Sequence, residues 1–158
     1  MKPGLGTRLR HLLELLEGDV ARVYAEGGLP DYRPRYTPVV RALEALGPAT
    51  IKAIAAHAGI SHSAVSQTLA QMRKAGLALT RIGSDARERE VAMSPALQAH
   101  LPRLHAHWRA TNAAADALDA ELTQALTSVV DEAITALERR PFRERIAKHL
   151  PRAGARKK

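Results

Sequence analysis

Apolar residues recur at three- and four-residue steps along most of the chain, which is the spacing of one face of an α-helix. The first such stripe is formed by Leu9, Leu12, Leu13, Leu16 and Val20. It predicts a helix over residues 7–26 that ends at the glycines of positions 27 and 28. Pro30 and Pro34 bias the residues before them away from helix, so a loop is expected up to residue 36.

Three shorter helices follow, each with a hydroxyl residue at its start and a glycine at its end. The pairs are Thr37 and Gly47, Thr50 and Gly59, and Ser61 and Gly76. A hydroxyl at the N-cap accepts a hydrogen bond from an otherwise unpaired backbone N–H, and glycine readily adopts the conformation that ends a helix. Pro38 strengthens the first start, because proline is favoured in the first helical turn.

The remaining pattern predicts a hairpin and then more helix. Residues 77–82 and 90–93 are short strand candidates, and the polar residues 83–89 between them form an exposed tip. Ser94 and Pro95 begin another helix, which Pro102 must kink or restart.

Beyond Pro102 an apolar stripe extends the helix to about residue 139, where Arg140 and Pro141 break it. Phe142, Ile146 and Leu150 then share one face of a final short helix. The predicted fold is therefore mainly α, with one small β-hairpin.

The two short helices on either side of Gly59 meet the physical demands of a helix-turn-helix motif. Ala55 is small where the helices approach each other, and Gly59 supplies the positive φ of the turn. Ile60 and Val65 fill the space between the helices. The second helix, residues 62–75, is then held so that its N-terminal half can enter a DNA major groove.

The outward face of that second helix is polar, uncharged and free of acidic residues. It carries His62, Ser63, Ser66, Gln67, Ala70 and Gln71. Glutamine can pair bidentately with adenine, and serine and histidine can reach base edges or phosphates. We expect Ser63, Ser66 and Gln67, with His62, to read bases. Gln71, Arg73, Lys74 and Lys52 would position the DNA backbone, and Ser61 with the free amides at the helix start suits a phosphate oxygen.

The hairpin after this helix corresponds to the wing of a winged helix-turn-helix. Arg87 at its tip is the residue type that enters a narrow minor groove, where the negative potential is concentrated. Asp85, two residues earlier, can pair with Arg87 and hold it extended.

Together these residues resemble the MarR family of bacterial transcriptional regulators. The resemblance rests on residues 51–67 (IKAIAAHAGISHSAVSQ), Gly76-Leu77, Asp85-Ala86-Arg87 and Met93-Ser94-Pro95, and it covers residues 37–97. Residues 31–38 and the run His-Ser-Ala-Val-Ser-Gln are more like a branch that often carries an acetyltransferase domain after the winged helix. In a chain of 158 residues we expect no such domain.

The resemblance implies a homodimer in which the N- and C-terminal helices pack across a two-fold axis. We therefore expect residues 1–36 to form an N-terminal dimerisation helix and loop, and residues 37–94 the winged DNA-binding domain. Residues 95–140 are expected to form long dimerisation helices, and residues 141–158 a short helix and a basic tail. In this family small aromatic effectors often bind between the dimerisation helices and the winged domain. Tyr24, Tyr36 and Trp108 are therefore candidate ligand-binding residues.

The net charge of +8 lies entirely in the C-terminal tail. Residues 139–158 contain nine Lys or Arg residues and one Glu, whereas residues 1–138 contain fifteen residues of each sign. Such a tail can hold phosphate non-specifically, or it can be a solvated terminus.

Other classes of function find little support in the sequence. The chain has no cysteine, no signal-peptide core and no apolar run near the 18 or so residues of a membrane span, which indicates a cytoplasmic protein, nucleoid-associated when bound to DNA. No catalytic or phosphate-binding motif appears, and we expect no enzyme activity and no cofactor. His100, His105 and His107 lack a matching carboxylate, so no metal site is expected.

We therefore interpret the chain as a sequence-specific DNA-binding regulator. It would be a dimeric repressor that binds a pseudo-palindromic operator and is released from it by a small ligand. The alternative is a winged-helix adaptor that binds a protein and does not bind DNA specifically.

Overall fold

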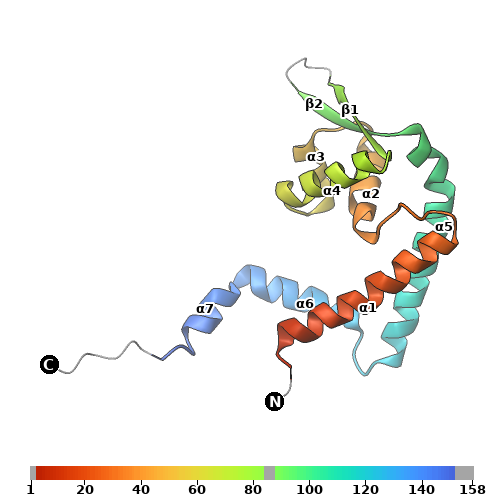
Figure 1. Ribbon diagram of the computed structural model, residues 1–158. Coiled ribbons are helices and arrows are strands. Elements are labelled where there is room, and N and C mark those ends of the chain that lie inside the picture. Colours follow the sequence, from red (N-terminus) through yellow and green to blue (C-terminus); the bar gives the residue numbers. More distant parts are fainter. Residues whose placement is uncertain (1–2, 84–87, 152–158) are drawn as a thin grey trace. The chain divides into compact units, whose positions relative to one another are not determined.

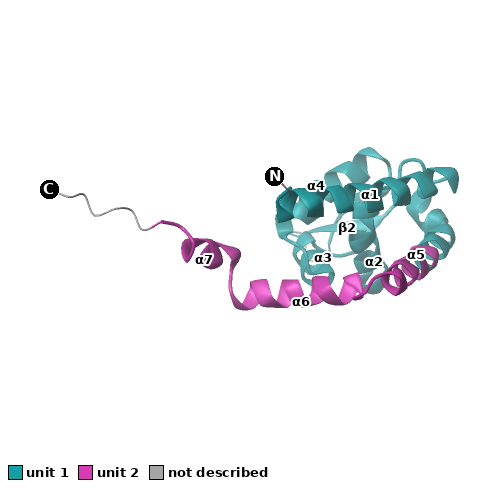
Figure 2. Cartoon of the chain, turned by 90° about the horizontal axis from the view of Figure 1, so that it is seen from below, with its two compact units in different colours: residues 1–109 teal, residues 110–158 magenta. Residues whose placement is uncertain are grey.

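The computed structural model describes residues 3–83 and 88–151 of the chain (Figure 1). By its internal contacts the chain divides into two compact units, residues 1–109 and residues 110–158 (Figure 2). In chain order the elements are α1 (Leu5–Glu26), the 3-10 turn η1 (Pro34–Tyr36), α2 (Thr37–Leu46), α3 (Ile51–Ala58), α4 (His62–Lys74), β1 (Ala78–Ile82), β2 (Arg89–Met93), α5 (Pro95–Glu121), α6 (Leu126–Arg139) and α7 (Phe142–Ala147). Helix α5 begins in the first unit and ends in the second.

The core of the first unit is formed by the inward faces of α2, α3, α4 and the start of α5. Its fully buried side chains include Val39, Val40, Leu43, Ile54, Val65, Leu69, Met72, Leu97 and Leu104. Val65, Leu69 and Met72 recur at steps of four and three, as the sequence predicts for the inner face of α4. The burial of this stripe fixes which face of α4 is turned outward.

The turn of the helix-turn-helix forms as its sequence dictates. Gly59 ends α3 in the left-handed conformation, with φ of 66°. Thr50 and Ser61 cap the two helices, because their hydroxyl oxygens accept hydrogen bonds from the N–H groups of Ala53 and Ala64, at 3.2 and 3.1 Å. The capping and turn predictions for this motif are confirmed.

Strands β1 and β2 pair antiparallel, from Ala78 opposite Met93 to Ile82 opposite Arg89. The predicted strand limits are confirmed to within one residue. Ala49, just before α3, forms an isolated β-bridge with Val91 that the sequence pattern does not predict. The two residues exchange two backbone hydrogen bonds, at 3.0 and 2.8 Å. This bridge ties the hairpin to the start of the helix-turn-helix.

The C-terminal turn of α1 is held by aromatic side chains. Tyr24, Tyr32 and Tyr36 are buried, and their rings meet edge to face at centroid distances of 4.9 and 5.7 Å. Burial, the main cause, strongly raises the pKa of Tyr32, so its hydroxyl stays protonated. That hydroxyl lies 3.2 Å from the hydroxyl of Thr37.

Thr37 does not cap α2, contrary to the sequence prediction. The 3-10 turn η1 runs directly into the helix, so Thr37 is already helical, and no side chain caps this start. Its hydroxyl instead meets the buried Tyr32.

The prediction of a single helix from Pro102 to residue 139 is wrong. Helix α5 continues through Pro102 without restarting, because Leu97, Leu101 and Leu104 pack on the core of the first unit and outweigh the lost backbone hydrogen bond. The chain breaks later, after Glu121, and α6 begins at Leu126.

The second unit has its own local stabilising contacts. The Asp119 carboxylate accepts hydrogen bonds from the backbone N–H groups of Leu126 and Thr127, at 2.7 and 3.3 Å, and from the Thr127 hydroxyl. It thereby caps α6 from the helix before it. The final short helix, predicted around Phe142, is confirmed as α7.

Candidate nucleic-acid interface

The outward face of α4 is accessible along its whole length. Ser63, Gln67, Ala70 and Lys74 are exposed, and steps of four, three and four residues place them on one side of the helix. His62 is also exposed at the first helical position. No residue from His62 to Lys74 is acidic, so nothing on this face repels a phosphate.

The structure separates the polar residues of α4 that were predicted to contact DNA into two groups. His62, Ser63 and Gln67 are exposed, whereas Ser66 and Gln71 are half-buried at the edge of the face. The exposed group lies in the N-terminal half of α4, the half that a helix-turn-helix presents to base edges.

The start of α4 offers backbone donors. The oxygen of Ser61 accepts the Ala64 N–H, but other N–H groups of the first turn have no partner within the helix. These groups, together with the helix dipole, favour a phosphate oxygen at this end.

Arg73 has a partner that the sequence does not reveal. Its Nη1 donates a hydrogen bond of 2.6 Å to the Thr80 hydroxyl of β1. Arg73 and Thr80 are both exposed. The side chain expected to contact phosphate therefore also links the end of α4 to the hairpin.

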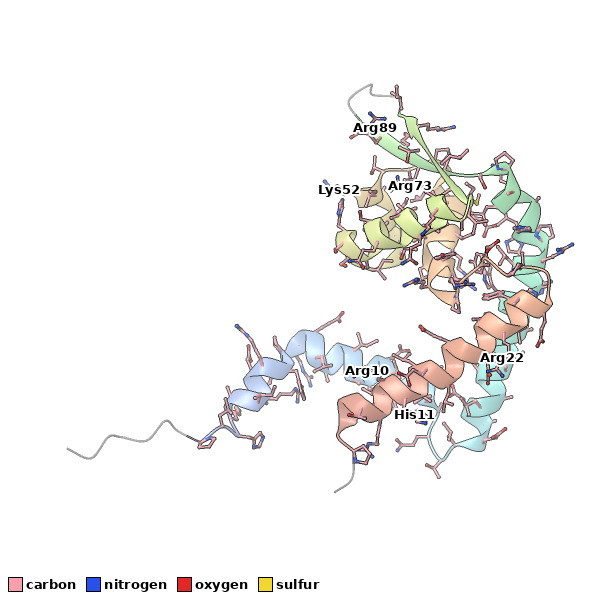
Figure 3. The ribbon with its side chains drawn as sticks, viewed as in Figure 1. Arg10, His11, Arg22, Lys52, Arg73 and Arg89 are labelled. Atoms are coloured by element: carbon pink, nitrogen blue, oxygen red, sulfur yellow. The ribbon has the colours of Figure 1, made fainter. Side chains whose placement is uncertain are left out.

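Cationic side chains flank α4 on two neighbouring elements (Figure 3). Lys52 is exposed on the first turn of α3, and Arg89 is exposed at the start of β2. Arg81, by contrast, pairs across the hairpin with Glu90 at 3.6 Å. Sequence reasoning passed over Arg89, although an arginine at the base of a predicted wing was a visible signal.

The predicted wing residues Asp85 and Arg87 lie outside the described residues. The structure describes the two strands that carry the tip. Gly83 N donates to the Glu88 carbonyl at 2.9 Å, so the strands remain paired up to the tip.

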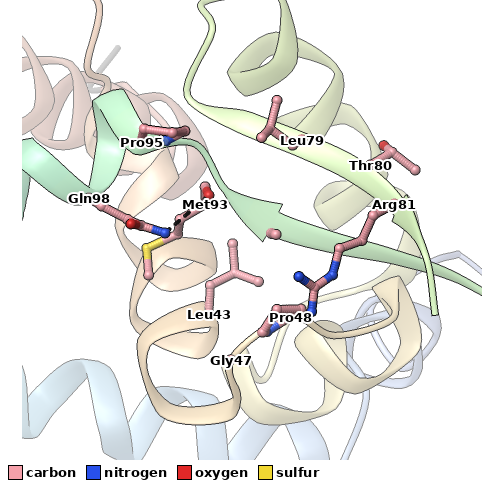
Figure 4. A pocket seen from close by; sticks show the side chains of 10 residues that line it. Leu43, Gly47, Pro48, Leu79, Thr80, Arg81, Met93, Pro95 and Gln98 are labelled. Carbon is pink, nitrogen blue, oxygen red and sulfur yellow. Dashed lines mark hydrogen bonds between the residues drawn. The ribbon is translucent and has the colours of Figure 1, made fainter. Parts of the chain in front are cut away.

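A cavity of about 430 Å³ lies between the end of α2, the hairpin and the start of α5 (Figure 4). Leu43, Pro48, Leu79 and Met93 give it a mainly apolar lining. Its polar side chains are Thr80, Arg81 and Gln98.

The aromatic residues predicted to bind an effector are buried in the first unit. Tyr24 and Tyr36 belong to the edge-to-face cluster, and Trp108 is 7% exposed. The Arg41 guanidinium lies 4.8 Å from the centre of the Trp108 ring system. The buried indole nitrogen of Trp108 has no hydrogen-bond partner in residues 3–83 and 88–151.

The histidines near Trp108 have structural contacts. His105 Nε2 lies 2.7 Å from a carboxylate oxygen of Glu44 and joins α5 to α2. His107 packs on Tyr24 at a centroid distance of 5.4 Å. In the described part of the chain, no group of three His, Cys, Asp or Glu side chains is arranged to hold a metal ion.

No helix of the described residues combines the length and the apolar character needed to cross a membrane.

These features define a winged helix-turn-helix protein with an open, acid-free recognition helix. A family model described as the MarR family matches residues 31–89. Over this winged-helix segment the chain is similar to the MarR family, in agreement with the resemblance of its residues.

Solved structures share this fold over most of the chain. One is the transcriptional regulator MOSR of M. tuberculosis in complex with DNA, 19% identical, covering 84% of this chain and 93% of that one with a TM-score of 0.62. Another is the PcaV transcriptional regulator from Streptomyces coelicolor in complex with its natural ligand, 16% identical, covering 89% and 98%, with a TM-score of 0.59.

A third is Bordetella bronchiseptica BpsR, described in a study of how 6-hydroxynicotinic acid regulates its DNA binding. It is 13% identical and covers 87% of this chain and 98% of that one, with a TM-score of 0.55. At these identities the likeness concerns the fold. No curated protein matches the chain.

Proposed function

We propose that the protein is a transcriptional regulator that binds a pseudo-palindromic operator as a homodimer and represses by occupying promoter DNA. The observation that carries this proposal is the exposed, acid-free face of α4, with Ser63 and Gln67 in its N-terminal half. Gln67 is suited to adenine, and Ser63 and His62 to base edges or phosphates. A protein with this function acts in the bacterial cytoplasm, on the nucleoid.

The proposed contacts around this face are of two kinds: phosphate contacts that position the DNA, and side-chain contacts that read bases. Lys52, Lys74 and the amides after Ser61 would hold phosphates and set the register of α4 in the groove. Ser66, Gln71 and Arg73 lie at its edges, and Arg89 adds a charge at the base of the wing. Arg87, with Asp85 beside it in sequence, would reach the flanking minor groove.

Apolar residues on two helices support the homodimer. On α1, Leu5, Leu9, Leu13 and Leu16 form a stripe whose members are between 41% and 60% exposed. On α6, Val130, Ile134 and Leu137 are between 41% and 50% exposed. Such stripes are costly to leave in water, and a second copy of the chain can cover both. Two recognition helices would then face successive major grooves of a symmetric site.

A small-molecule effector near Tyr24, Tyr36 and Trp108 is part of the proposal. Among the described residues the indole N–H of Trp108 has no hydrogen-bond partner, and Arg41 lies nearby. Both favour an aromatic acid, whose carboxylate can accept a hydrogen bond from the indole and pair with the guanidinium. Of the solved structures with a similar fold, PcaV is in complex with its natural ligand, and the DNA binding of BpsR is regulated by 6-hydroxynicotinic acid. Because Trp108 is the single tryptophan, its fluorescence reports such binding directly. A set of aromatic acids without effect on that fluorescence would rule this site out.

The test of the main proposal is selection of bound fragments from random duplex DNA by the full chain. The expected result is an inverted repeat whose half-sites lie about one helical turn apart, centre to centre. Sedimentation of the free and DNA-bound protein gives the number of chains per site. Recovery of fragments without a shared motif would reject sequence-specific binding and favour the adaptor alternative. No enzymatic step is part of the proposal.

A further inference from the structure

We propose that four cations of the basic C-terminal segment (residues 139–158), namely Arg139, Arg140, Arg143 and Lys148, form a second DNA-binding surface that contacts the phosphate backbone outside the operator without reading sequence. The inference rests on the proposed function only in that the winged domain brings DNA to the same chain. It assigns a partner to the part of the chain that holds all of the net charge.

The distribution of charge carries the first step. Residues 139–158 hold nine basic residues against Glu144, whereas the preceding 138 residues are neutral. The winged domain, residues 37–94, has seven basic and four acidic residues, a net charge of +3. Phosphate neutralisation supplies most of the non-specific affinity for DNA, and the largest reserve of positive charge lies outside the winged domain.

The described part of the segment keeps this charge accessible. Arg139, Arg143 and Lys148 are exposed, and Arg140 is half-buried. None of these four makes an ion pair within residues 3–83 and 88–151. Their charges therefore remain available to an external anion.

One arginine of the segment has a different role. Arg145 donates to the Ala136 carbonyl at 2.9 Å and to the Arg140 carbonyl at 3.4 Å. It thus joins α7 to backbone carbonyls at the C-terminal end of α6. This contact stabilises the turn between α6 and α7, which carries the neighbouring cations. A test of DNA binding should therefore leave Arg145 unchanged.

DNA fits this surface better than the acidic part of the same chain. Residues 95–138 carry six acidic and two basic residues, a net charge of −4 spread over two helices. Duplex DNA presents one charge every ~1.7 Å and releases condensed counterions when cations bind. Binding of the winged domain would also raise the local concentration of DNA at the segment.

The experiment compares the full-length protein with a triple variant, Arg139→Gln, Arg143→Gln and Lys148→Gln. A control variant, Arg10→Gln, Arg22→Gln and Arg109→Gln, loses the same charge from exposed positions elsewhere. Binding to a random 30-base-pair duplex and to the selected operator is titrated at several salt concentrations. Circular dichroism verifies that all three proteins are folded, and sedimentation compares their oligomeric states.

The segment variant is expected to bind both duplexes more weakly by a similar factor. Each lost phosphate contact lowers the salt slope by about 0.9 and, at about 0.1 M salt, weakens binding roughly eightfold. The control variant should keep the wild-type slope. The ratio of operator to random affinity should not change, which separates this surface from the reading face of α4.

Equal salt slopes for the segment variant and the control overturn the proposal. DNA binding by the segment variant that equals wild-type binding also overturns the proposal. In that case binding of the wild-type protein to phosphatidylserine vesicles would point to a membrane, and a changed oligomeric state of the variant would point to contacts with the acidic helices. Failure of the proposed function looks different: no operator is selected, yet binding to random duplex still depends on the segment.

Discussion

The guanidinium of Arg73 donates a hydrogen bond of 2.6 Å to the hydroxyl of Thr80, which joins the last turn of α4 to strand β1. The contact connects the helix proposed to read bases with the hairpin proposed to enter the minor groove. Because both residues are exposed, we expect a net contribution to stability of about 1 kcal/mol or less. Its main consequence is to fix the relative orientation of these two elements.

Thr80→Val and Arg73→Gln should therefore weaken operator binding by similar, several-fold factors, and the double variant should be no worse than either single one. The reason is that both changes remove the same link between α4 and β1. A double-mutant cycle on the dissociation constants measures this coupling. If Arg73→Gln weakens binding while Thr80→Val does not, Arg73 acts directly on a phosphate.

Gln67→Ala should relax the choice of base at one position of each half-site by about 1–3 kcal/mol. The Gln67 side chain is exposed in the N-terminal half of α4, where it can pair with an adenine. Titration against operators with each base at each position measures the loss. Gln98→Ala, an exposed glutamine on α5, is the matched control. An unchanged preference at every position would remove Gln67 from the reading face.

Arg87→Ala should weaken binding to all sequences and lower the salt slope by about 1. A minor-groove arginine contributes through the negative potential of the groove more than through base identity. Arg89→Ala, at the base of the same wing, provides the comparison. A change in base preference without any change in the salt slope would contradict a role in the minor groove.

The helix-turn-helix and the hairpin were predictable because their signals are local. Gly59 and the hydroxyls of Thr50 and Ser61 act within four residues of their own positions, and the strands are bounded by turn residues. The exposed face of α4 was largely predictable for the same reason. Once Val65, Leu69 and Met72 are buried, helical geometry fixes the outward residues.

The features that sequence reasoning missed depend on partners farther away. The break after Glu121 contains neither glycine nor proline, and the apolar stripe continues across it. It is stabilised by Asp119, which reaches seven residues along the chain to Leu126. The bridge of Ala49 to Val91 and the link of Arg73 to Thr80 likewise join segments that no periodic pattern connects.

Gly27→Ala should destabilise the first unit by about 1 kcal/mol, because a Cβ there would clash with Nε2 of His107. The His107 ring packs on Tyr24, so it must leave that contact to make room. Urea unfolding measures the loss. His107→Ala in the same chain should remove most of the added penalty, and Gly18→Ala, where a Cβ meets nothing within 4 Å, should not destabilise α1. A Gly27→Ala penalty that persists without His107 would place the strain elsewhere.

The start of α6 should depend on the charge of Asp119. The Thr127 hydroxyl is the main cause of a lowered Asp119 pKa, and the N–H groups of Thr127 and Leu126 lower it further. A carboxylate with a lowered folded-state pKa stabilises the structure above its unfolded value of 3.8, and this contribution is lost as the pH falls through the folded-state pKa. The Leu126 amide should therefore be protected from hydrogen exchange near pH 7 and lose protection in acid below pH 3.8.

Asp119→Ala should lower the protection of the Leu126 amide several-fold at neutral pH and abolish its acid dependence, measured by exchange relative to the intrinsic rate. Glu121→Gln changes an exposed carboxylate two residues away and should leave both quantities as they are. Asp119→Asn separates charge from shape, because its amide oxygen can still accept the Leu126 N–H. It should keep part of the protection at every pH but none of the acid-dependent part. Acid-dependent protection that survives in Asp119→Asn would mean that another carboxylate caps α6.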